Sequence, residues 1–218
     1  IKSSSSSNQQ PDGAKAYINL SRTGNTPFEI AKKMLENSSR QLFWSHNQVI
    51  IISQELAQEG IAKYLDLFIH HPETRLLAYV LISQGPAQEI LESLSYLERT
   101  SSKEIAKTLD DMPRASLAPQ ITLNILAERL LSKTASAVVP LISLTSQGQG
   151  QSINISGMAA FKGDKLAGFL DEKETRGFIW VMGKVKGGAV NVAGLHGEGM
   201  STLAILRENV KIVPVISE

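Results

Sequence analysis

The fold is decided by residues 137–170, AVVPLISLTSQGQGQSINISGMAAFKGDKLAGFL, where the chain changes from helical to β patterning. Apolar residues recur here at every second position, which is typical of a strand with one buried face. The apolar set is Ile153, Ile155, Ala159 and Phe161, and the opposite face is expected to carry Asn154, Ser156 and Met158. Gly163-Asp164 then predicts a tight hairpin turn into a strand from Leu166 to Leu170. A further strand is expected from Ala137 to Leu144, where Pro140 favours an edge position or a bulge.

A polar, glycine-containing break interrupts this stretch at Gln147-Gly148-Gln149-Gly150-Gln151 and indicates a domain boundary. Residues 1–13 are rich in Ser, Asn and Gln, and are expected to form a flexible linker or loop. We therefore expect an N-terminal α+β domain over residues 14–148. A second, smaller, β-rich α+β domain is expected over residues 149–218.

Helices are predicted where apolar residues recur at helical spacing. Thr26-Pro27-Phe28-Glu29 and Asp171 with Glu174 both have the pattern of a capped helix start. The second of these helices is expected to end near Gly183, with a core face of Phe178, Ile179 and Met182. A short helix is expected from Glu55 to Glu59. The other stripes are Ile61, Leu65, Phe68 and Ile69; Ile90, Leu91, Leu94 and Leu97; Ile105, Leu109 and Met112, between a Ser101-Ser102 cap and Pro113; and Leu123, Leu126, Ala127, Leu130 and Leu131.

Short apolar runs predict the remaining strands. They are Lys15 to Leu20, Val49 to Ile52, Leu76 to Ile82, Ala189 to Val192 and Leu203 to Ile216. Strands and helices are mixed without a regular alternation. This favours an α+β fold of two mixed α/β domains, in which small sheets pack against helices.

The composition excludes several classes of function. The formal net charge is only +1, so no net field favours nucleic acid, anionic lipid or an acidic partner. The chain has no cysteine, which excludes disulfides, thiolate metal sites and cysteine nucleophiles. No stretch reaches the roughly 18 to 20 apolar residues of a membrane span. The first residues, IKSSSSS, lack the order of a signal peptide, so we expect either a cytosolic protein or a mature or trimmed form.

Two blocks of sequence carry a resemblance to a known family. The first contains GNTPFEIAKKML and RQLFWSHNQVIIISQELAQEGIAKYLDLFIHHPETR, and the second is FKGDKLAGFLDEKETRGFIWVMGKVKGG, residues 161–188. In this order they resemble the C subunits of spore nutrient germinant receptors, the Ger(x)C family of spore germination lipoproteins. The motif positions of the first block are Gly24, Thr26, Arg40, Leu42, Phe43, His46, Glu55, Ala57, Gly60, Ile61, Pro72, Glu73 and Arg75. The chain departs from the family at His70-His71, where an Arg-Asp pair is expected, and it lacks the lipobox cysteine and a third, C-terminal domain.

The resemblance implies a two-domain piece of a larger, secreted lipoprotein. It implies a palmitate-containing diacylglycerol anchor upstream of Ile1, and residence on the outer face of the spore inner membrane. The implied partners are the integral-membrane A and B subunits of the receptor, with no cofactor and no nucleic acid. The function expected is non-enzymatic, through protein contacts in receptor assembly or signal relay during germination. The alternative is a subunit of the same receptor that itself binds an amino acid or a sugar.

Residues that can carry chemistry are better explained by folding. His46 has no orienting acid placed by spacing, and is expected to bond a backbone group and fix a loop. His70 and His71 are adjacent, so they point in different directions and do not chelate one ion. Asp171 and Glu174 suit a helix start more than general acid–base catalysis. We therefore expect no catalytic, cofactor or metal site.

Charged residues that folding does not explain are the candidates for partner contacts. They are Arg40, His46, Glu73, Arg75, Arg176, Lys184 and Lys186. Arginine suits bidentate pairing with a carboxylate, so Arg75 can bind a partner or pair with Glu73 or Glu55 of its own chain. Trp44 and Trp180 are expected in the core, or as anchors for a partner if they are exposed.

Overall fold

A computed structural model describes residues 19–36, 43–93, 98, 100–147, 150–193, 200–206, 208–211 and 213. The helices are α1 (Pro27–Glu36), the 3₁₀ helix η1 (Trp44–His46), α2 (Gln54–Glu59), α3 (Ala62–His70), α4 (Ala87–Glu92), α5 (Ser101–Ala115), α6 (Leu123–Leu131) and α7 (Glu172–Val181). The strands are β1 (Val49–Ser53), β2 (Tyr79–Ser83), β3 (Val138–Gln147), β4 (Gly150–Lys162), β5 (Lys165–Leu170), β6 (Ala189–Ala193) and β7 (Met200–Ala204). The α+β class predicted from the sequence is confirmed.

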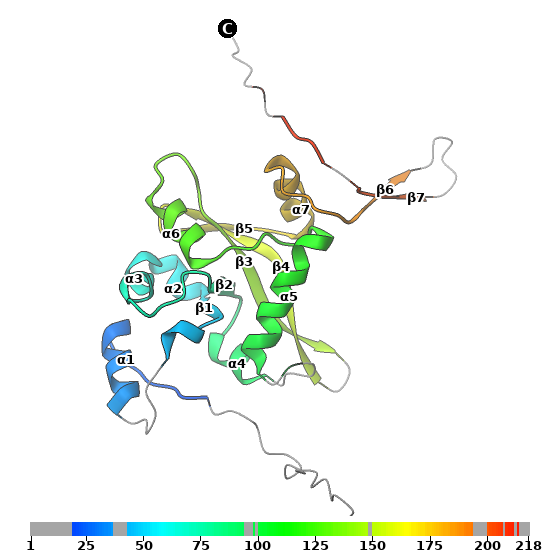
Figure 1. Cartoon of the computed structure of the whole chain (residues 1–218). Helices are drawn as coiled ribbons and strands as arrows, with labels where there is room; N and C mark the ends of the chain where they lie inside the picture. The colour runs from blue at the N-terminus through cyan, green and yellow to red at the C-terminus, as the bar shows by residue number, and fades with distance from the viewer. Residues whose placement is uncertain are drawn as a thin grey trace, which may run out of the picture.

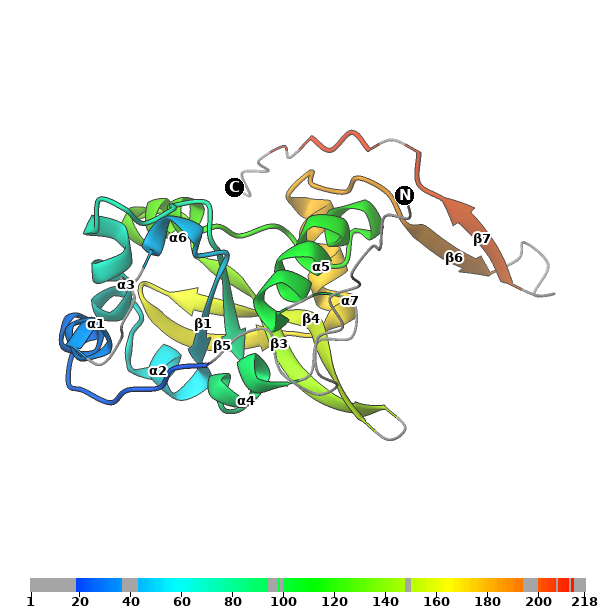
Figure 2. The ribbon, with the colours of Figure 1, turned by 60° about the horizontal axis from the view of Figure 1, so that its bottom comes forward.

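A five-stranded sheet forms the centre of the molecule, in the order β1-β2-β3-β4-β5 (Figure 1). β1 pairs with β2, and β2 with β3, in parallel, whereas β3, β4 and β5 form an antiparallel meander. Parallel neighbours need a crossover connection, which α2 and α3 supply between β1 and β2. Helices α4, α5 and α6 lie in the connection from β2 to β3. In Figure 2, α3 and α6 lie to the left of β1 and β2, and α5 lies to their right.

The sheet divides the hydrophobic core into two clusters. One cluster joins the sheet to α2, α3 and α6, and includes Ile52, Val80, Ala57, Leu65 and Leu126. The other joins the sheet to α4 and α5, and includes Leu81, Ile142, Ile90, Ile105 and Leu109. Because both faces of the central strands are covered, β2 is a continuous apolar run rather than an alternating one.

A bulge in β4 changes the face on which its apolar residues lie. Pro140 pairs with Met158 and Ile142 pairs with Ile155, so β4 contains one more residue than β3 over this step. The extra residue lies beside Gly157, whose φ is +80°. As a result Ile155 packs in the α5 cluster, whereas Ala159 and Phe161 pack in the α3 cluster. The single apolar face expected for this strand is therefore wrong, because the bulge inverts the alternation.

The same pairing bears on Pro140 and on the domain boundary. The bulge expected near Pro140 is present, but β3 is the middle strand of the sheet rather than an edge. β3 and β4 form one hairpin, with Gln147 paired to Gly150. Residues on both sides of the boundary expected between 148 and 149 therefore belong to one sheet.

Helices α4 and α5 follow the predicted stripes with small shifts at their ends. α5 is capped by Thr100, whose hydroxyl accepts the Lys103 N–H at 3.3 Å, rather than by Ser101-Ser102. Pro113 lies inside the last turn of α5, which continues to Ala115. α4 ends at Glu92, and the expected positions Leu94 and Leu97 lie outside the described residues.

The observed strand boundaries differ from the predicted ones more than the helix boundaries do. β2 starts at Tyr79 because residues 76–77 form a turn. β7 ends at Ala204, and the described residues after it are not strand. Of the strand expected from Lys15 to Leu20, residues 15–18 lie outside the described residues and 19–20 are not strand.

Helix α7 begins with the capping box that its sequence predicts. The Asp171 carboxylate accepts the Glu174 N–H at 2.7 Å, and the Glu174 carboxylate accepts the Asp171 N–H at 3.0 Å. The helix ends before Gly183, which has φ +61°. Its buried face consists of Thr175 and Ile179, whereas Met182, expected in the core, is 36% exposed.

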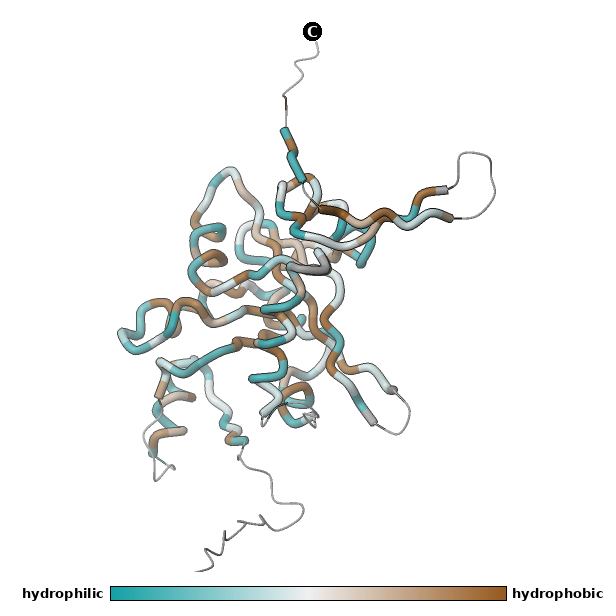
Figure 3. The backbone as a smooth tube through the Cα atoms, turned by 45° about the vertical axis from the view of Figure 1, so that its right-hand side comes forward, coloured by the Kyte–Doolittle hydropathy of each residue, from teal (hydrophilic) through white to brown (hydrophobic). Residues whose placement is uncertain are grey.

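The second sheet contains β6 and β7 and projects beyond α7 (Figure 1). Figure 3 shows apolar residues both in the central strands and along this projecting hairpin. Val190, Val192, Met200 and Leu203 of the hairpin are exposed. Among the helices in the described part of the chain, none combines the length and the apolar character needed to cross a bilayer.

Candidate functional site

The two sequence blocks that carry the family resemblance meet in the structure. The Ile61 N–H donates to the Asp164 carbonyl at 2.9 Å, which fixes the α2–α3 connection on the β4–β5 turn. Gly60 has φ +121°, and a Cβ placed there would lie 2.7 Å from Asp164 Oδ2. Glycine is therefore required at this close approach. The Gly60-Ile61 and Gly163-Asp164 motifs have a shared structural role rather than separate chemical ones.

Five rings form a surface beside η1, which we call the η1 surface: Phe43, Trp44, His46, Phe68 and His71. The Phe43 and His46 rings have centroids 5.6 Å apart, and the Trp44 ring lies 5.7 Å from Phe68 and 5.8 Å from His71. Phe43 is 65% exposed, although it is one of the largest apolar side chains in the chain. Its neighbours border a groove of about 440 Å³ between α1, η1 and β1. An exposed aromatic group of this kind is typical of a protein-contact surface.

The α3–β2 turn continues from the η1 surface. The Glu73 N–H donates to His71 Nδ1 at 3.3 Å, which joins this turn to the Trp44 stack. Glu73 and Arg75 are both exposed. Among the described residues, the Arg75 guanidinium makes no ion pair, so the pairing with Glu73 or Glu55 considered from the sequence is not formed.

The remaining predicted contact residues lie elsewhere or outside the described residues. Arg176 donates from Nη2 to the Ala189 carbonyl at 2.7 Å, which holds the start of β6 against α7. Lys184 and Lys186 follow α7 and border a separate cavity. Arg40 lies outside the described residues. The structure thus places His46 beside Phe43 and Glu73 beside His71, and uses Arg176 at least in part for folding.

A partly buried tyrosine, Tyr79, links β2 to α5. The Tyr79 hydroxyl donates to Asp110 Oδ1 at 2.5 Å and accepts from Gln120 Nε2 at 3.2 Å. Gln120 Nε2 also lies 3.2 Å from the Leu109 carbonyl. Burial, and then the hydrogen bond to Asp110, raise the pKa of Tyr79 to about 12. Tyr79 is therefore a neutral donor at neutral pH.

Removing the Tyr79 hydroxyl is expected to change how the free energy of unfolding depends on pH. Tyr79→Phe is expected to lower the free energy of unfolding at pH 7 by about 1 kcal/mol, since two hydrogen bonds lose a partner. A group whose pKa is raised on folding stabilises the folded state at pH values below its pKa in the unfolded chain, which is about 10 for tyrosine. This stabilisation is lost as the pH rises through the pKa of the folded state. Denaturant unfolding between pH 9 and 12 should therefore show a steeper loss of stability in the wild type than in Tyr79→Phe.

The matched control is Tyr64→Phe, which removes an exposed hydroxyl that donates to Glu59 at 2.9 Å. Its effect on stability at pH 7 shows what the loss of an exposed tyrosine hydroxyl costs. Equal slopes for the wild type and Tyr79→Phe over this range would contradict the assignment.

Side chains with catalytic potential are used in folding or lie apart. Asp171 and Glu174 are occupied by the capping box. His70 Nδ1 lies 3.0 Å from Asp66 Oδ1 at the exposed end of α3. In the described ranges, no three His, Asp or Glu side chains are grouped so that they could hold a metal ion.

Sequence patterns did not reveal the contacts of Trp44, Phe68 and His71, or the network of Tyr79 and Gln120. Phe68, expected on a core stripe, is partly buried and packs against the core. The two tryptophans were expected in the core, or as anchors for a partner if exposed, and Trp180 is 39% exposed. These contacts join residues from different elements, and no local spacing indicates them. The only signal was the clustering of aromatic and histidine residues in the first sequence block.

The fold and these sequence blocks have counterparts among known proteins. The crystal structure of the GerBC protein superposes with a TM-score of 0.53 and 18% sequence identity, covering 87% of this chain and 53% of that one. This likeness shows the fold. A model of the spore germination protein N-terminal domain matches residues 1–144, and the "Spore germination B3/GerAC like, C-terminal" model matches residues 156–218. The chain belongs to this family of spore germination proteins.

Relatives in Bacillus subtilis (strain 168) support the same assignment. Spore germination protein YndF is 30% identical over 179 residues, which cover 81% of this chain and 43% of that protein. Spore germination protein KC is 25% identical over 209 residues, covering 88% and 51% of the two chains. Spore germination protein B3 is 23% identical over 213 residues, covering 97% and 56%. The chain spans about half the length of these relatives.

Proposed function

We propose that this chain is part of a non-enzymatic, lipid-anchored subunit of a spore nutrient germinant receptor, and that it acts through protein contacts. Its partners would be the integral-membrane A and B subunits on the outer face of the spore inner membrane. The family assignment supports a role in spore germination. The single observation that favours protein contact is the η1 surface, where Phe43 is left 65% exposed beside Trp44 and His46.

The exposed Phe43 side chain offers a partner protein a large apolar group to bury. Burying an aromatic side chain contributes to association more than burying most other residues, and such residues dominate binding energy at interfaces. Glu73 and Arg75 lie on the adjoining turn, and the Glu73 N–H bonds His71 of the η1 surface. Exposed charges beside an apolar centre are the arrangement of an interface with a polar rim.

A substitution in this surface tests the proposal. Phe43→Ser in the full-length parent protein is expected to slow nutrient-triggered germination about tenfold, since loss of one aromatic anchor weakens an interface by about 1–2 kcal/mol. Arg75→Glu is expected to have a smaller effect in the same direction. Germination is followed by the fall in optical density of a spore suspension, and immunoblots report the amounts of the variant and of the membrane subunits.

The control is Phe169→Ser, which changes another exposed phenylalanine on β5, away from the η1 surface. It should leave the rate near wild type. Arg176 is unsuitable for this purpose, because its bond to the Ala189 carbonyl is part of the fold. Wild-type germination with normal amounts of Phe43→Ser and Arg75→Glu would refute the proposed contact surface.

A further inference from the structure

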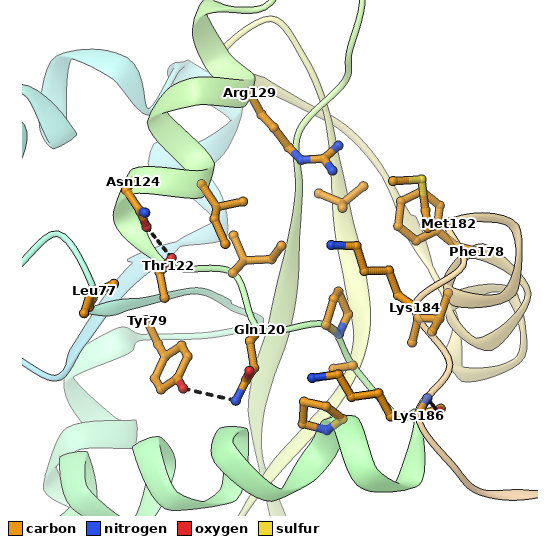
Figure 4. A pocket seen from close by; sticks show the side chains of 18 residues that line it. Leu77, Tyr79, Gln120, Thr122, Asn124, Arg129, Phe178, Met182, Lys184 and Lys186 are labelled. Carbon is orange, nitrogen blue, oxygen red and sulfur yellow. Dashed lines mark hydrogen bonds between the residues drawn. The ribbon is translucent and has the colours of Figure 1, made fainter. Parts of the chain in front are cut away.

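A cavity of about 410 Å³ lies between the C-terminal end of α5, residues 116–122, α6 and the C-terminal end of α7 (Figure 4). This volume is in the range of small-ligand pockets, which is roughly 300–1,000 Å³. Its apolar walls include Ile121, Ile125, Phe178 and Met182. The cavity is far from a simple apolar gap, because charged side chains enter it from two sides.

Three cationic side chains border the cavity. Arg129 extends from α6, and Lys184 and Lys186 extend from the opposite wall after α7, with all three charged ends directed into the space (Figure 4). No Asp or Glu is among the residues that border it. Glu208 contacts the same segment, but its carboxylate accepts the Val185 N–H at 2.6 Å and does not border the cavity.

These cations are not neutralised within the described part of the chain. Neither lysine forms an ion pair there, and Arg129 donates only a long bond of 3.4 Å to the Ser136 carbonyl. Three like charges directed into one space repel one another, and an anion placed between them relieves this repulsion. Arginine also offers paired donors that match a carboxylate or a phosphate.

Several neutral polar groups of the cavity already have partners. Gln120 Nε2 lies within bonding distance of the Tyr79 hydroxyl and the Leu109 carbonyl. The Thr122 hydroxyl bonds the Asn124 side chain. The groups that remain for a ligand are therefore mainly the three cations and the apolar walls.

The lysine-bearing wall is fixed in place before any ligand binds. Ser116 ends α5 in the left-handed conformation, and its hydroxyl donates to the Gly187 carbonyl at 2.8 Å. The same oxygen accepts the Lys186 N–H at 3.2 Å. A wall held by these hydrogen bonds to the Ser116 hydroxyl reduces the ordering that binding would require.

We propose that this cavity binds a small organic anion whose carboxylate or phosphate group pairs with Arg129, Lys184 and Lys186. The apolar part of the ligand would lie against Phe178, Met182 and Ile125. This cavity is separate from the η1 surface, so the proposed anion binding does not depend on the proposed receptor contacts.

Isothermal titration calorimetry on the full 218-residue chain tests the charge requirement. The probes are 4-phenylbutyrate, its neutral amide of the same shape, and phenyl phosphate. At least one anionic probe is expected to bind at least tenfold more tightly than the amide, and to weaken as salt is raised from 50 to 500 mM. The order of the two anions shows whether a carboxylate or a phosphate is preferred.

Substitutions of the three cations show whether the anion binds in this cavity. Arg129→Gln and the double variant Lys184→Gln/Lys186→Gln are each expected to weaken the bound anion at least tenfold. The matched control is Lys162→Gln, an exposed lysine at the β4–β5 turn that does not border the cavity, and it should bind as the wild type does. Circular dichroism confirms that each variant is folded.

Two results would overturn the inference. One is equal binding of the amide and the anions, or no binding of either anion up to 10 mM. The other is binding that Lys162→Gln weakens as much as the folded cavity variants do, which would indicate a general attraction of anions to surface charge.

Discussion

Gly157→Ala is expected to lower the free energy of unfolding by about 3 kcal/mol. Gly157 has φ +80°, a conformation that costs other residues about 1–2 kcal/mol. A Cβ at this position would also lie 2.7 Å from the Leu170 carbonyl oxygen and 3.3 Å from Leu141 Cδ1. Because the first of these is a backbone atom next to the Asp171 cap, the strain can be relieved only by moving the start of α7.

The measurement is guanidinium unfolding followed by circular dichroism, with Gly168→Ala as the matched control. Gly168 lies in β5, and a Cβ added there meets nothing within 4 Å. Its substitution is expected to change stability by less than about 1 kcal/mol. Equal stabilities of Gly157→Ala and Gly168→Ala would mean that the bulge is not constrained as the structure indicates.

Phe161→Ala is expected to have an effect of similar or larger size, about 3–5 kcal/mol, because it removes a buried aromatic ring and leaves a cavity. Phe161 is only 2% exposed and packs in the cluster that joins the sheet to α2, α3 and α6. Phe169 lies on the next strand but is 42% exposed. Phe169→Ala should therefore cost about 1 kcal/mol or less when measured in the same way.

The outcome that would contradict this prediction is a similar loss of stability in the two phenylalanine variants. Such a result would place Phe161 on a solvent-facing side of β4. It would also argue against the change of face at Gly157, since that change is what directs Phe161 into the α3 cluster.

Local patterns predicted the elements that local interactions determine. The α7 start follows from Asp171 and Glu174, because a capping box involves atoms only three residues apart. The β4–β5 turn follows from Gly163-Asp164 for the same reason: one short stretch contains the whole interaction. The apolar stripe that begins at Leu123 predicted the helix observed as α6, although its last member, Leu131, is exposed.

Long-range arrangements could not be predicted from these patterns. The extra residue beside Gly157 is defined by pairing with β3, and a period-two pattern in β4 alone does not contain it. The hydrogen bond from Ile61 to Asp164 joins two motifs that are far apart in the sequence. The same holds for the cavity, where Arg129 and Lys186 face each other only after α6 and α7 have packed on the sheet.

The candidate contact residues were predicted less completely than the fold. His46 and Glu73 were selected as charged or polar motif positions, and the structure places His46 beside Phe43 and Glu73 beside His71. The exposure of Phe43 was not predicted, because an aromatic residue before an apolar strand is most simply assigned to the core. Exposure depends on what covers a residue, and sequence spacing carries no information about that.

The most direct test of the proposed function is affinity capture of the tagged full-length parent protein from detergent-solubilised spore membranes, with mass spectrometry of the captured proteins. We expect integral-membrane germinant receptor subunits to be recovered with the wild type and with Phe169→Ser. We expect at least tenfold less recovery with Phe43→Ser. Recovery of the parent protein from the membrane without those subunits, or recovery unaffected by Phe43→Ser, would contradict the proposal that this chain acts through contacts at the η1 surface.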